Sequence, residues 1–339
     1  MIQFLDQTLE KEYTRFVLSF QDSWIYYSLK FRDLLQSYID CSVHYVLSID
    51  DNNGIEAVLP IMVLEGSLGK VVNSLPFYGS NGGILGASSS ARQELLDYYN
   101  QFVSATGVVA ATYNEHPFHR NVEKIKHTYV EHRIAQVTKL EPQDDLMSLF
   151  HQKTRNMIRK ATKLGITART DNLSFDFLVS THEKNMAAIG GKAKAPLFFE
   201  KINQLFEPGQ DYNIFVASMD GRDVAALLVL YFNRTAEYFT PVIEQEYRST
   251  QALSLLIKYA MEEAQSRDMK FWNWGGTWPS QEGVYRFKKR WGATEQEYKY
   301  FTYVPEPALV VTKSKDFLLN EYPDFFVVPF SELQDSQNE

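Results

Sequence analysis

Apolar and polar residues change their spacing several times along this chain, and each change marks a predicted element. In the first part, helical spacing gives way to strands of alternating residues, joined at the turn sequence Asp51-Asn-Asn-Gly54. A glycine-rich loop, a capped helix and two apolar strands follow. The predicted helices of this part are 4–20, 24–38 and 91–106, and its strands are 42–49, 55–64, 108–112 and 134–140.

The second part begins after a linker that contains Pro142, with a long basic helix that ends at Gly165. Two more helices, a hairpin and a third strand come next, and then a helix, a strand, a short helix and a last strand. The predicted helices are 146–164, 174–189, 197–206, 250–267 and 283–290, and the strands are 212–218, 224–232, 236–240, 270–274 and 298–304.

The length of the chain favours two domains. Its 339 residues are many for one hydrophobic core. We therefore expect a first domain at 1–141 and a second at 142–304, with the tail 305–339 packing back on the first.

Composition narrows the class of protein. The chain is 45% hydrophobic, so it can bury large cores, and its formal net charge of −8 argues against bulk binding to DNA. One cysteine, Cys41, excludes an internal disulfide and favours a reducing compartment. No apolar run approaches the ~20 residues of a membrane span, and residues 1–12 lack the apolar core of a signal peptide. We expect a cytoplasmic protein.

The stretch 271–292 combines several features of a ligand platform. A buried strand breaks at Gly275-Gly276, where the backbone can turn or approach a ligand closely. Ser280 is a plausible N-cap for the short cationic helix that follows, and Gly292 ends that helix.

Four motifs carry a resemblance to a known family. They are Val58-Leu-Pro60; Leu75-Pro-Phe-Tyr-Gly79 with Gly82-Gly83; Lys153-Thr-Arg-Asn-Met-Ile-Arg-Lys-Ala161 with Gly165; and Val284-Tyr-Arg-Phe-Lys-Lys-Arg-Trp-Gly292. Their order resembles the FemAB family, tRNA-dependent peptidyl transferases that build peptidoglycan cross-bridges, over roughly residues 40–304. It is equally similar to relatives with a BioF2-like acyltransferase domain, found in envelope-polysaccharide pathways. The resemblance implies an α/β (α+β) protein of two tandem acetyltransferase-like (GNAT) domains, each a mixed, mostly antiparallel sheet flanked by helices.

The resemblance also implies a catalytic lysine at Lys288. An ammonium there would stabilise the charge that develops on a leaving alkoxide or thiolate. The alternative is that Lys288 belongs to a solvated helix face with Lys289 and Arg290, because charge runs usually lie at the surface.

Arg155 and Arg159 lie at i and i+4 of the long basic helix and so share one face. Two guanidiniums one turn apart suit a phosphate or diphosphate of the acceptor. A solvated face paired with carboxylates elsewhere is an equal alternative.

Aromatic residues are candidates for a sugar- or acyl-binding groove, although clustered aromatics are more often core. The candidates are Tyr238, Trp274, Trp278 and Tyr285. Asn273 is a further substrate-binding candidate. It stands where the relatives usually carry an acidic residue, two positions before the glycine that ends the strand, and an amide cannot act as a base.

Two other features favour structural roles. The Gly79–Gly83 loop fits a plain turn slightly better than a phosphate site. Glu115, His116, His119 and His127 do not follow a recognised metal-ligand spacing, and we expect no metal.

Together the residues and the resemblance predict a transferase that moves an acyl or aminoacyl group to an amine of a cell-envelope precursor, a peptidoglycan peptide or an amino-sugar. The acceptor would be nucleotide- or lipid-linked. We expect no tightly bound cofactor, and the donor is aminoacyl-tRNA or acyl-CoA. Residues 247–252, where acetyl-CoA-binding relatives carry glycines, contain none. The alternative is a non-catalytic binding protein of the same fold that recognises an envelope precursor or an assembly partner.

Overall fold

Contacts divide the chain into two compact units. The computed structural model describes residues 1–75, 81–119, 124–142 and 145–334. One unit is Met1–Ile134 with Gln296–Glu339, and the other is Ala135–Glu295. These limits differ from the expected 1–141 and 142–304, because two strands, β7 (Tyr129–Lys139) and β13 (Thr294–Tyr303), each cross from one unit into the other.

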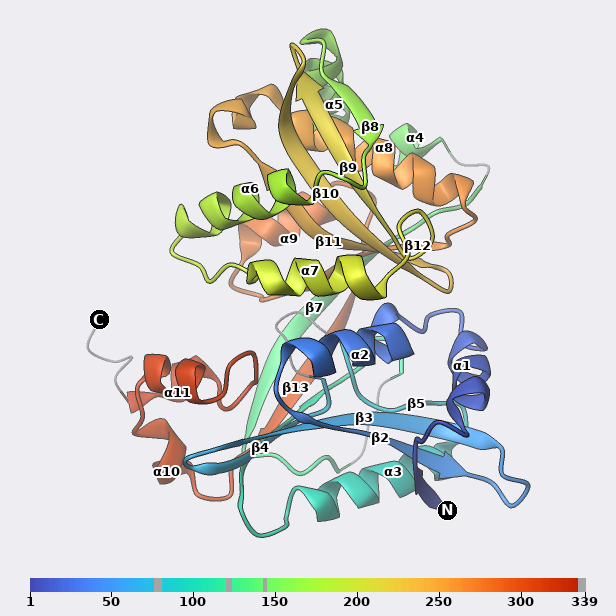
Figure 1. Ribbon diagram of the computed structural model, residues 1–339, viewed down its shortest axis with the longest axis vertical. Coiled ribbons are helices and arrows are strands. Elements are labelled where there is room, and N and C mark those ends of the chain that lie inside the picture. The colour runs from blue at the N-terminus through green and yellow to red at the C-terminus, as the bar shows by residue number, and fades with distance from the viewer. Residues whose placement is uncertain (76–80, 120–123, 143–144, 335–339) are drawn as a thin grey trace. The chain divides into compact units, whose positions relative to one another are not determined.

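The first unit is a mixed sheet in the order β1-β2-β3-β4-β6-β13, with β5 paired to β3. Its neighbouring strands run antiparallel, except that β4 and β6 are parallel. Helix α3 covers one face of the sheet and α1 and α2 the other (Figure 1). Its strands are β1 (Ile2–Phe4), β2 (Ser42–Ile49), β3 (Ile55–Gly66), β4 (Gly69–Asn73), β5 (Leu85–Gly86) and β6 (Val108–Asn114). Its helices are α1 (Glu10–Leu18), η1 (Ile25–Tyr27), α2 (Leu29–Tyr38), α3 (Ser89–Phe102), α10 (Pro307–Val311), α11 (Lys315–Glu321) and η3 (Phe330–Glu332).

The tail contacts the two ends of β4 in this unit, Gly69 and Asn73. The Tyr322 hydroxyl donates to the carbonyl of Gly69 at 2.9 Å. Asn73 accepts from the backbone N–H of Phe326 at 2.7 Å and donates to its carbonyl at 2.9 Å. The side-chain amide of Asn73, the last residue of β4, therefore holds the tail backbone at Phe326 through two hydrogen bonds.

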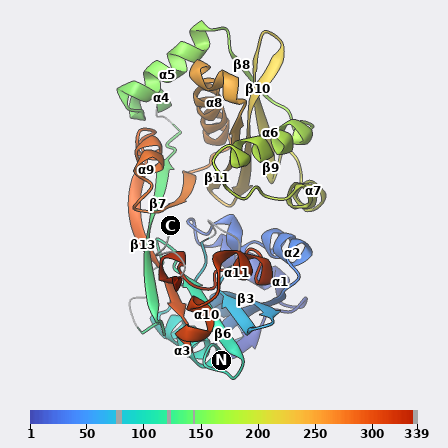
Figure 2. The same cartoon turned by 90° about the vertical axis from the view of Figure 1, so that its left-hand side faces the viewer.

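The second unit is a mixed sheet in the order β7-β12-β11-β10-β9-β8, in which β11 and β12 run parallel. Helices α6 and α7 lie on one face and α8 on the other (Figure 2). Its strands are β8 (Thr167–Thr170), β9 (Tyr212–Met219), β10 (Arg222–Phe232), β11 (Thr235–Ile243) and β12 (Phe271–Thr277). Its helices are α4 (Leu146–Leu149), α5 (Gln152–Lys163), α6 (Phe175–Ala187), α7 (Pro196–Leu205), η2 (Gln245–Thr250), α8 (Ala252–Ser266) and α9 (Glu282–Lys289). The α/β class with a mixed sheet and flanking helices is confirmed, but the strands of the described residues belong to one 13-stranded sheet rather than to two separate sheets.

The predicted helix 146–164 is broken into α4 and α5. Phe150 takes an extended conformation, with φ −78° and ψ 141°. Its ring packs edge-on against Trp291 at 4.9 Å between centroids. Burial of this aromatic pair outweighs helix continuity, and the His151 side chain then caps the new N-terminus through the Lys153 N–H.

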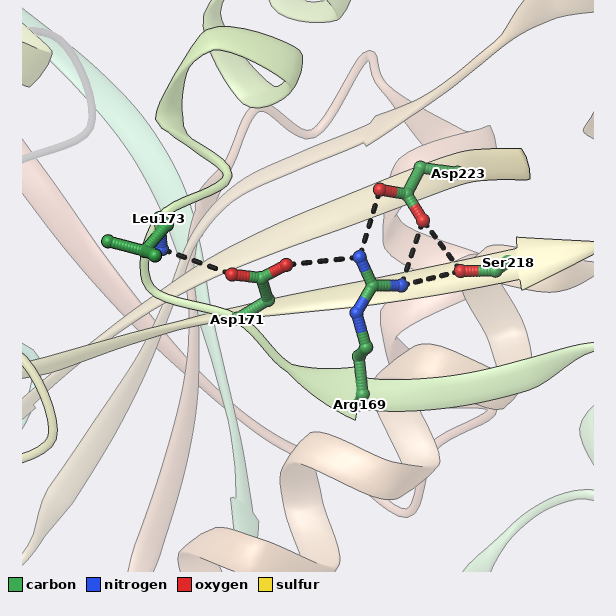
Figure 3. A network of polar contacts seen from close by, with 5 residues as sticks. All are labelled: Arg169, Asp171, Leu173, Ser218 and Asp223. Atoms are coloured by element: carbon green, nitrogen blue, oxygen red, sulfur yellow. Dashed lines mark hydrogen bonds and ion pairs between the residues drawn. The ribbon is translucent and has the colours of Figure 1, made fainter. Parts of the chain in front are cut away.

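A cluster of ion pairs lies on the edge strand β8 of the second unit. Figure 3 shows Arg169 on β8 between Asp171, Ser218 and Asp223. The guanidinium binds both oxygens of Asp223, at 2.8 and 3.0 Å, and Asp171 at 3.0 Å. This bidentate pair holds the four-residue edge strand β8 in place. Charged side chains on an edge strand also oppose its pairing with another chain.

Across the described ranges, every helix is too short or too polar to span a lipid bilayer.

Candidate active site

The parallel ladder between β11 and β12 stops partway along both strands. Its pairs are Thr235–Phe271, Ala236–Trp272 and Glu237–Asn273. Beyond Glu237, β11 runs on to Ile243, and beyond Asn273, β12 runs on to Thr277. Backbone groups on these facing edges need other partners, which a bound substrate can supply.

Glu237 is a buried carboxylate at the last pair of this ladder. Its side chain is 2% exposed and accepts from the Asn273 side-chain amide at 2.9 Å. Asn273 is fully buried, and its oxygen accepts from the Gly275 N–H at 2.9 Å. Gly275 has a φ of 71°, which favours glycine. Asn273 thus orients the carboxylate and holds the backbone of β12 at Gly275. The strand continues through Gly275 and Gly276 to Thr277, so the break predicted there from the sequence does not occur.

Lys288 on α9 contacts the C-terminal part of β12. Its Nζ donates to the Thr277 hydroxyl at 2.8 Å and to the carbonyls of Gly276 and Gly275 at 3.1 and 3.3 Å. No carboxylate pairs with it among the residues the structure describes. Burial lowers the pKa of Lys288 to about 8. The side chain is therefore not part of a solvated face, whereas its neighbour Lys289 is exposed and bonds Tyr285.

The aromatic candidates fall into different environments. Trp274 is 2% exposed, and its Nε1 donates to the Thr138 hydroxyl at 2.9 Å, so its role here is core packing. Tyr238 packs on it at 4.9 Å between centroids. Tyr285 is half-buried and hydrogen-bonds Glu295, while Trp278 is 40% exposed just after β12. Tyr238 and Tyr285 remain candidates for substrate contact, and the buried Trp274 packs against Tyr238.

The basic helix α5 begins against the end of α9. The Arg290 carbonyl accepts from the His151 N–H at 2.9 Å and from the Thr154 hydroxyl at 3.2 Å. Arg155 is half-buried and donates to the Phe150 carbonyl at 2.8 Å and to Gln152 at 2.7 Å. Arg159 is exposed and has only a long contact of 3.4 Å with Asn156. The two guanidiniums are thus not equivalent, because the chain itself engages Arg155.

Lys194, like Lys288, is a lysine with a lowered pKa and no ion-pair partner in the described residues. Its Nζ lies 5.3 Å from the centre of the Phe239 ring, and burial lowers the pKa of Lys194 to about 8. Phe239 sits at a bulge of β11, where the register with β10 shifts between Leu228 and Val229. The cation is therefore held next to the unpaired part of β11.

Two further sequence predictions concern the first part of the chain. Residues 76–80 of the glycine loop are outside the described residues. His116 and His119 contact Asp22, through its carbonyl at 3.2 Å and its carboxylate at 2.8 Å. No group of three or more potential metal ligands occurs in the part of the chain that the structure describes.

Sequence reasoning missed Glu237 and Lys194. A signal was present for Glu237, since it is a lone carboxylate within an otherwise apolar strand, Thr235–Ile243. Lys194 stands in a polar, glycine-containing loop, where an exposed lysine is the ordinary expectation. Only the fold places it over Phe239.

The arrangement offers a buried carboxylate bonded to Asn273 of β12 and a buried ammonium bonded to Gly275, Gly276 and Thr277 of the same strand. Asn273 and Gly275 are two residues apart, roughly 7 Å along a strand. A carboxylate can take a proton from an attacking amine, and an ammonium can stabilise a developing oxyanion.

Comparisons with known proteins show which family and fold this chain resembles. The FemAB family model matches residues 210–309, which include β11, β12 and α9. The structure of FemX is similar with a TM-score of 0.68 at 12% identity, over 91% of this chain and 98% of that one. A tandem GNAT protein from the clavulanic acid biosynthesis pathway gives 0.54 at 9% identity, over 91% and 99%. The C-terminal domain of a putative lysylphosphatidylglycerol synthetase from Agrobacterium fabrum gives 0.55 at 10%, over 94% and 98%. No curated protein matches. The chain is FemAB-like and has the tandem GNAT fold.

Proposed function

We propose that this protein transfers an aminoacyl group from aminoacyl-tRNA to an amine of a cell-envelope precursor. The observation that carries the proposal is the pairing of Glu237 with Asn273 at the end of the β11–β12 ladder, two residues before the part of β12 that binds Lys288. The match to the FemAB family model over this same region supports it, as does the likeness to a domain named for lysylphosphatidylglycerol synthesis.

In the proposed reaction the acceptor amine attacks the ester carbonyl of the donor directly. A C–N bond forms, the C–O bond to the tRNA ribose breaks, and the ribose hydroxyl leaves. Glu237 takes the proton from the attacking amine, and that proton is returned to the ribose oxygen. The Lys288 ammonium donates to the oxygen on which negative charge develops. No covalent enzyme intermediate is required.

The donor side favours RNA over coenzyme A. The segment before α8 is the 3-10 helix η2, Gln245–Thr250, which contains no glycine. The Thr250 hydroxyl accepts from the Ala252 N–H at 3.3 Å, and Gln251 holds a φ of 66°. A side chain already bonds the first N–H of α8, in a place where a pyrophosphate would need free N–H groups.

On the acceptor side we assign the anionic part of the precursor to Lys194. Its ammonium lies over Phe239, beside the unpaired length of β11, and has no carboxylate of this chain to neutralise it among the described residues. A phosphate or carboxylate of a nucleotide- or lipid-linked precursor would supply that charge.

The test is turnover with aminoacyl-tRNA set against acyl-CoA, over a panel of amine acceptors that includes nucleotide-linked amino-sugars and peptidoglycan peptides. An amide product that forms only with the tRNA donor supports the proposal. Transfer from acyl-CoA alone would mean that acyl-CoA, and not aminoacyl-tRNA, is the donor. No transfer from either donor would contradict an enzymatic function.

A second candidate is a binding protein that keeps the fold without the chemistry. The observation in its favour is that three acceptors of the chain itself already surround the Lys288 ammonium. In that case Lys288 only joins α9 to β12. Saturable binding of an envelope precursor together with no transfer would select this candidate.

A further inference from the structure

Positive charge is concentrated in one short stretch of an acidic chain. The whole chain has a formal net charge of −8. Residues 146–170, by contrast, contain six lysines and arginines and no aspartate or glutamate. Helix α5 lies within this stretch and carries five of the six cations.

Five of these six cations have no ion-pair partner in the described residues, and four of the five are exposed. Arg169 is clamped by Asp171 and Asp223, and Arg155 is held by the Phe150 carbonyl. The other four, all exposed, are Lys153, Arg159, Lys160 and Lys163, which we call the α5 cationic face.

Helical geometry places these four side chains away from the protein core. The buried residues of α5 are Thr154, Ile158 and Ala161, on the side that packs toward α8. At 3.6 residues per turn, the α5 cationic face lies opposite them and extends for about 15 Å along the helix. A row of unpaired cations of this length matches a chain of phosphates.

The face is anchored to the candidate active site. The Arg290 carbonyl, two residues after Lys288, accepts from the first turn of α5 through His151 and Thr154. A side chain at Gly292 would contact Leu149, so the two segments are also in close packing. A ligand on α5 is thereby fixed relative to α9.

We propose that the α5 cationic face docks the phosphodiester backbone of the donor tRNA, a role that rests on the proposed aminoacyl transfer. An anionic membrane fits less well, because an interfacial helix needs an apolar side to bury in lipid. The apolar side of α5 is already buried in the protein, and its exposed side is polar up to Leu164 at the end. Backbone contacts of this kind carry no sequence specificity.

The experiment measures binding of deacylated tRNA by fluorescence anisotropy over a series of salt concentrations. The variant changes Lys153, Arg159, Lys160 and Lys163 to Gln, a good helix former. The control carries the same loss of charge elsewhere, with Lys11, Arg15, Lys313 and Lys315 changed to Gln. Thermal melts establish that both fold. Vesicles of phosphatidylcholine with and without phosphatidylglycerol form a second arm.

The α5 variant is expected to bind tRNA at least about tenfold more weakly at 0.1 M salt, with a salt slope lower by about 3, while the control binds as wild type. Equal binding by variant and wild type overturns the proposal, and so does binding to anionic vesicles without binding to tRNA. Because binding is measured without turnover, tRNA docking on α5 in a protein that transfers nothing would refute only the proposed function. Transfer from tRNA with unchanged binding by the α5 variant would refute only this inference.

Discussion

The carboxylate of Glu237 and the amide of Asn273 are joined by a 2.9 Å hydrogen bond, at the last residue pair of two parallel strands. Asn273 cannot act as a base, but its side-chain amide orients the Glu237 carboxylate at the point where the pairing of β11 and β12 ends. The residue that looks like a departure from the family pattern is therefore a partner of the carboxylate that we assign to proton transfer.

Replacement of Glu237 by Gln is expected to lower the transfer rate by roughly 10²- to 10⁴-fold, because the base is lost. The new amide oxygen still accepts from Asn273, so the melting temperature should stay close to that of wild type. Glu295→Gln, which changes an exposed carboxylate bonded to Tyr285, serves as the control. Full activity of Glu237→Gln would assign the proton transfer to another group.

Asn273→Asp should make folding stability depend on pH. Two buried carboxylates in contact cannot both ionise, so the pKa of the pair rises above the ordinary value near 4. The folded state then holds a proton that the unfolded state releases, and stability falls as pH rises from about 4 through the raised pKa. The melting temperature of Asn273→Asp should fall further below that of wild type at pH 8 than at pH 5. A loss of the same size at both values would mean that the two carboxylates do not interact.

The sequence allowed much of this fold to be predicted, and the failures have physical causes. Regular periodicity identified the hairpin β9–β10 and helix α8 closely. It missed the break at Phe150, since burial of that ring against Trp291 depends on a segment far away in the chain. Short strands such as β1 and β8 carry too few residues for a pattern.

The surroundings of each candidate residue were predictable only where they depend on nearby residues of the chain. Lys288 follows from a local motif, and the structure accounts for it through local contacts with Gly275, Gly276 and Thr277. Glu237 acquires its partner only through strand pairing over 36 residues. Trp274 lies in a motif that suggested a substrate groove. Its side chain is instead buried in the hydrophobic core of the second unit.

Lys288→Met should lower the transfer rate by about 10²- to 10³-fold, the usual effect of losing one oxyanion donor. The melting temperature should change little, because the lost hydrogen bonds are offset by removal of a buried charge. Lys289→Met, a change of the exposed neighbour on the same helix, is the matched control. A normal rate with a large drop in melting temperature would give Lys288 a purely structural role.

The pH profile offers an independent test of the charge on Lys288. Its pKa is about 8, so the ammonium is mostly present at neutral pH and is lost as pH rises through that value. The rate should decline above pH 8 with a single alkaline limb. In Lys288→Arg the guanidinium stays charged, and any remaining activity should lack this limb. If the limb persists in that variant, it belongs to the acceptor amine or to another residue.

The most direct measurement is a single-turnover reaction of the wild-type protein with tRNA charged with a labelled amino acid, in the presence of a nucleotide-linked amine acceptor. The account predicts an amide-linked product that forms with wild type and Lys289→Met and is lost in a Glu237→Gln, Lys288→Met double variant. Label that stays on the tRNA with every acceptor, or product that forms equally well with the double variant, would contradict it.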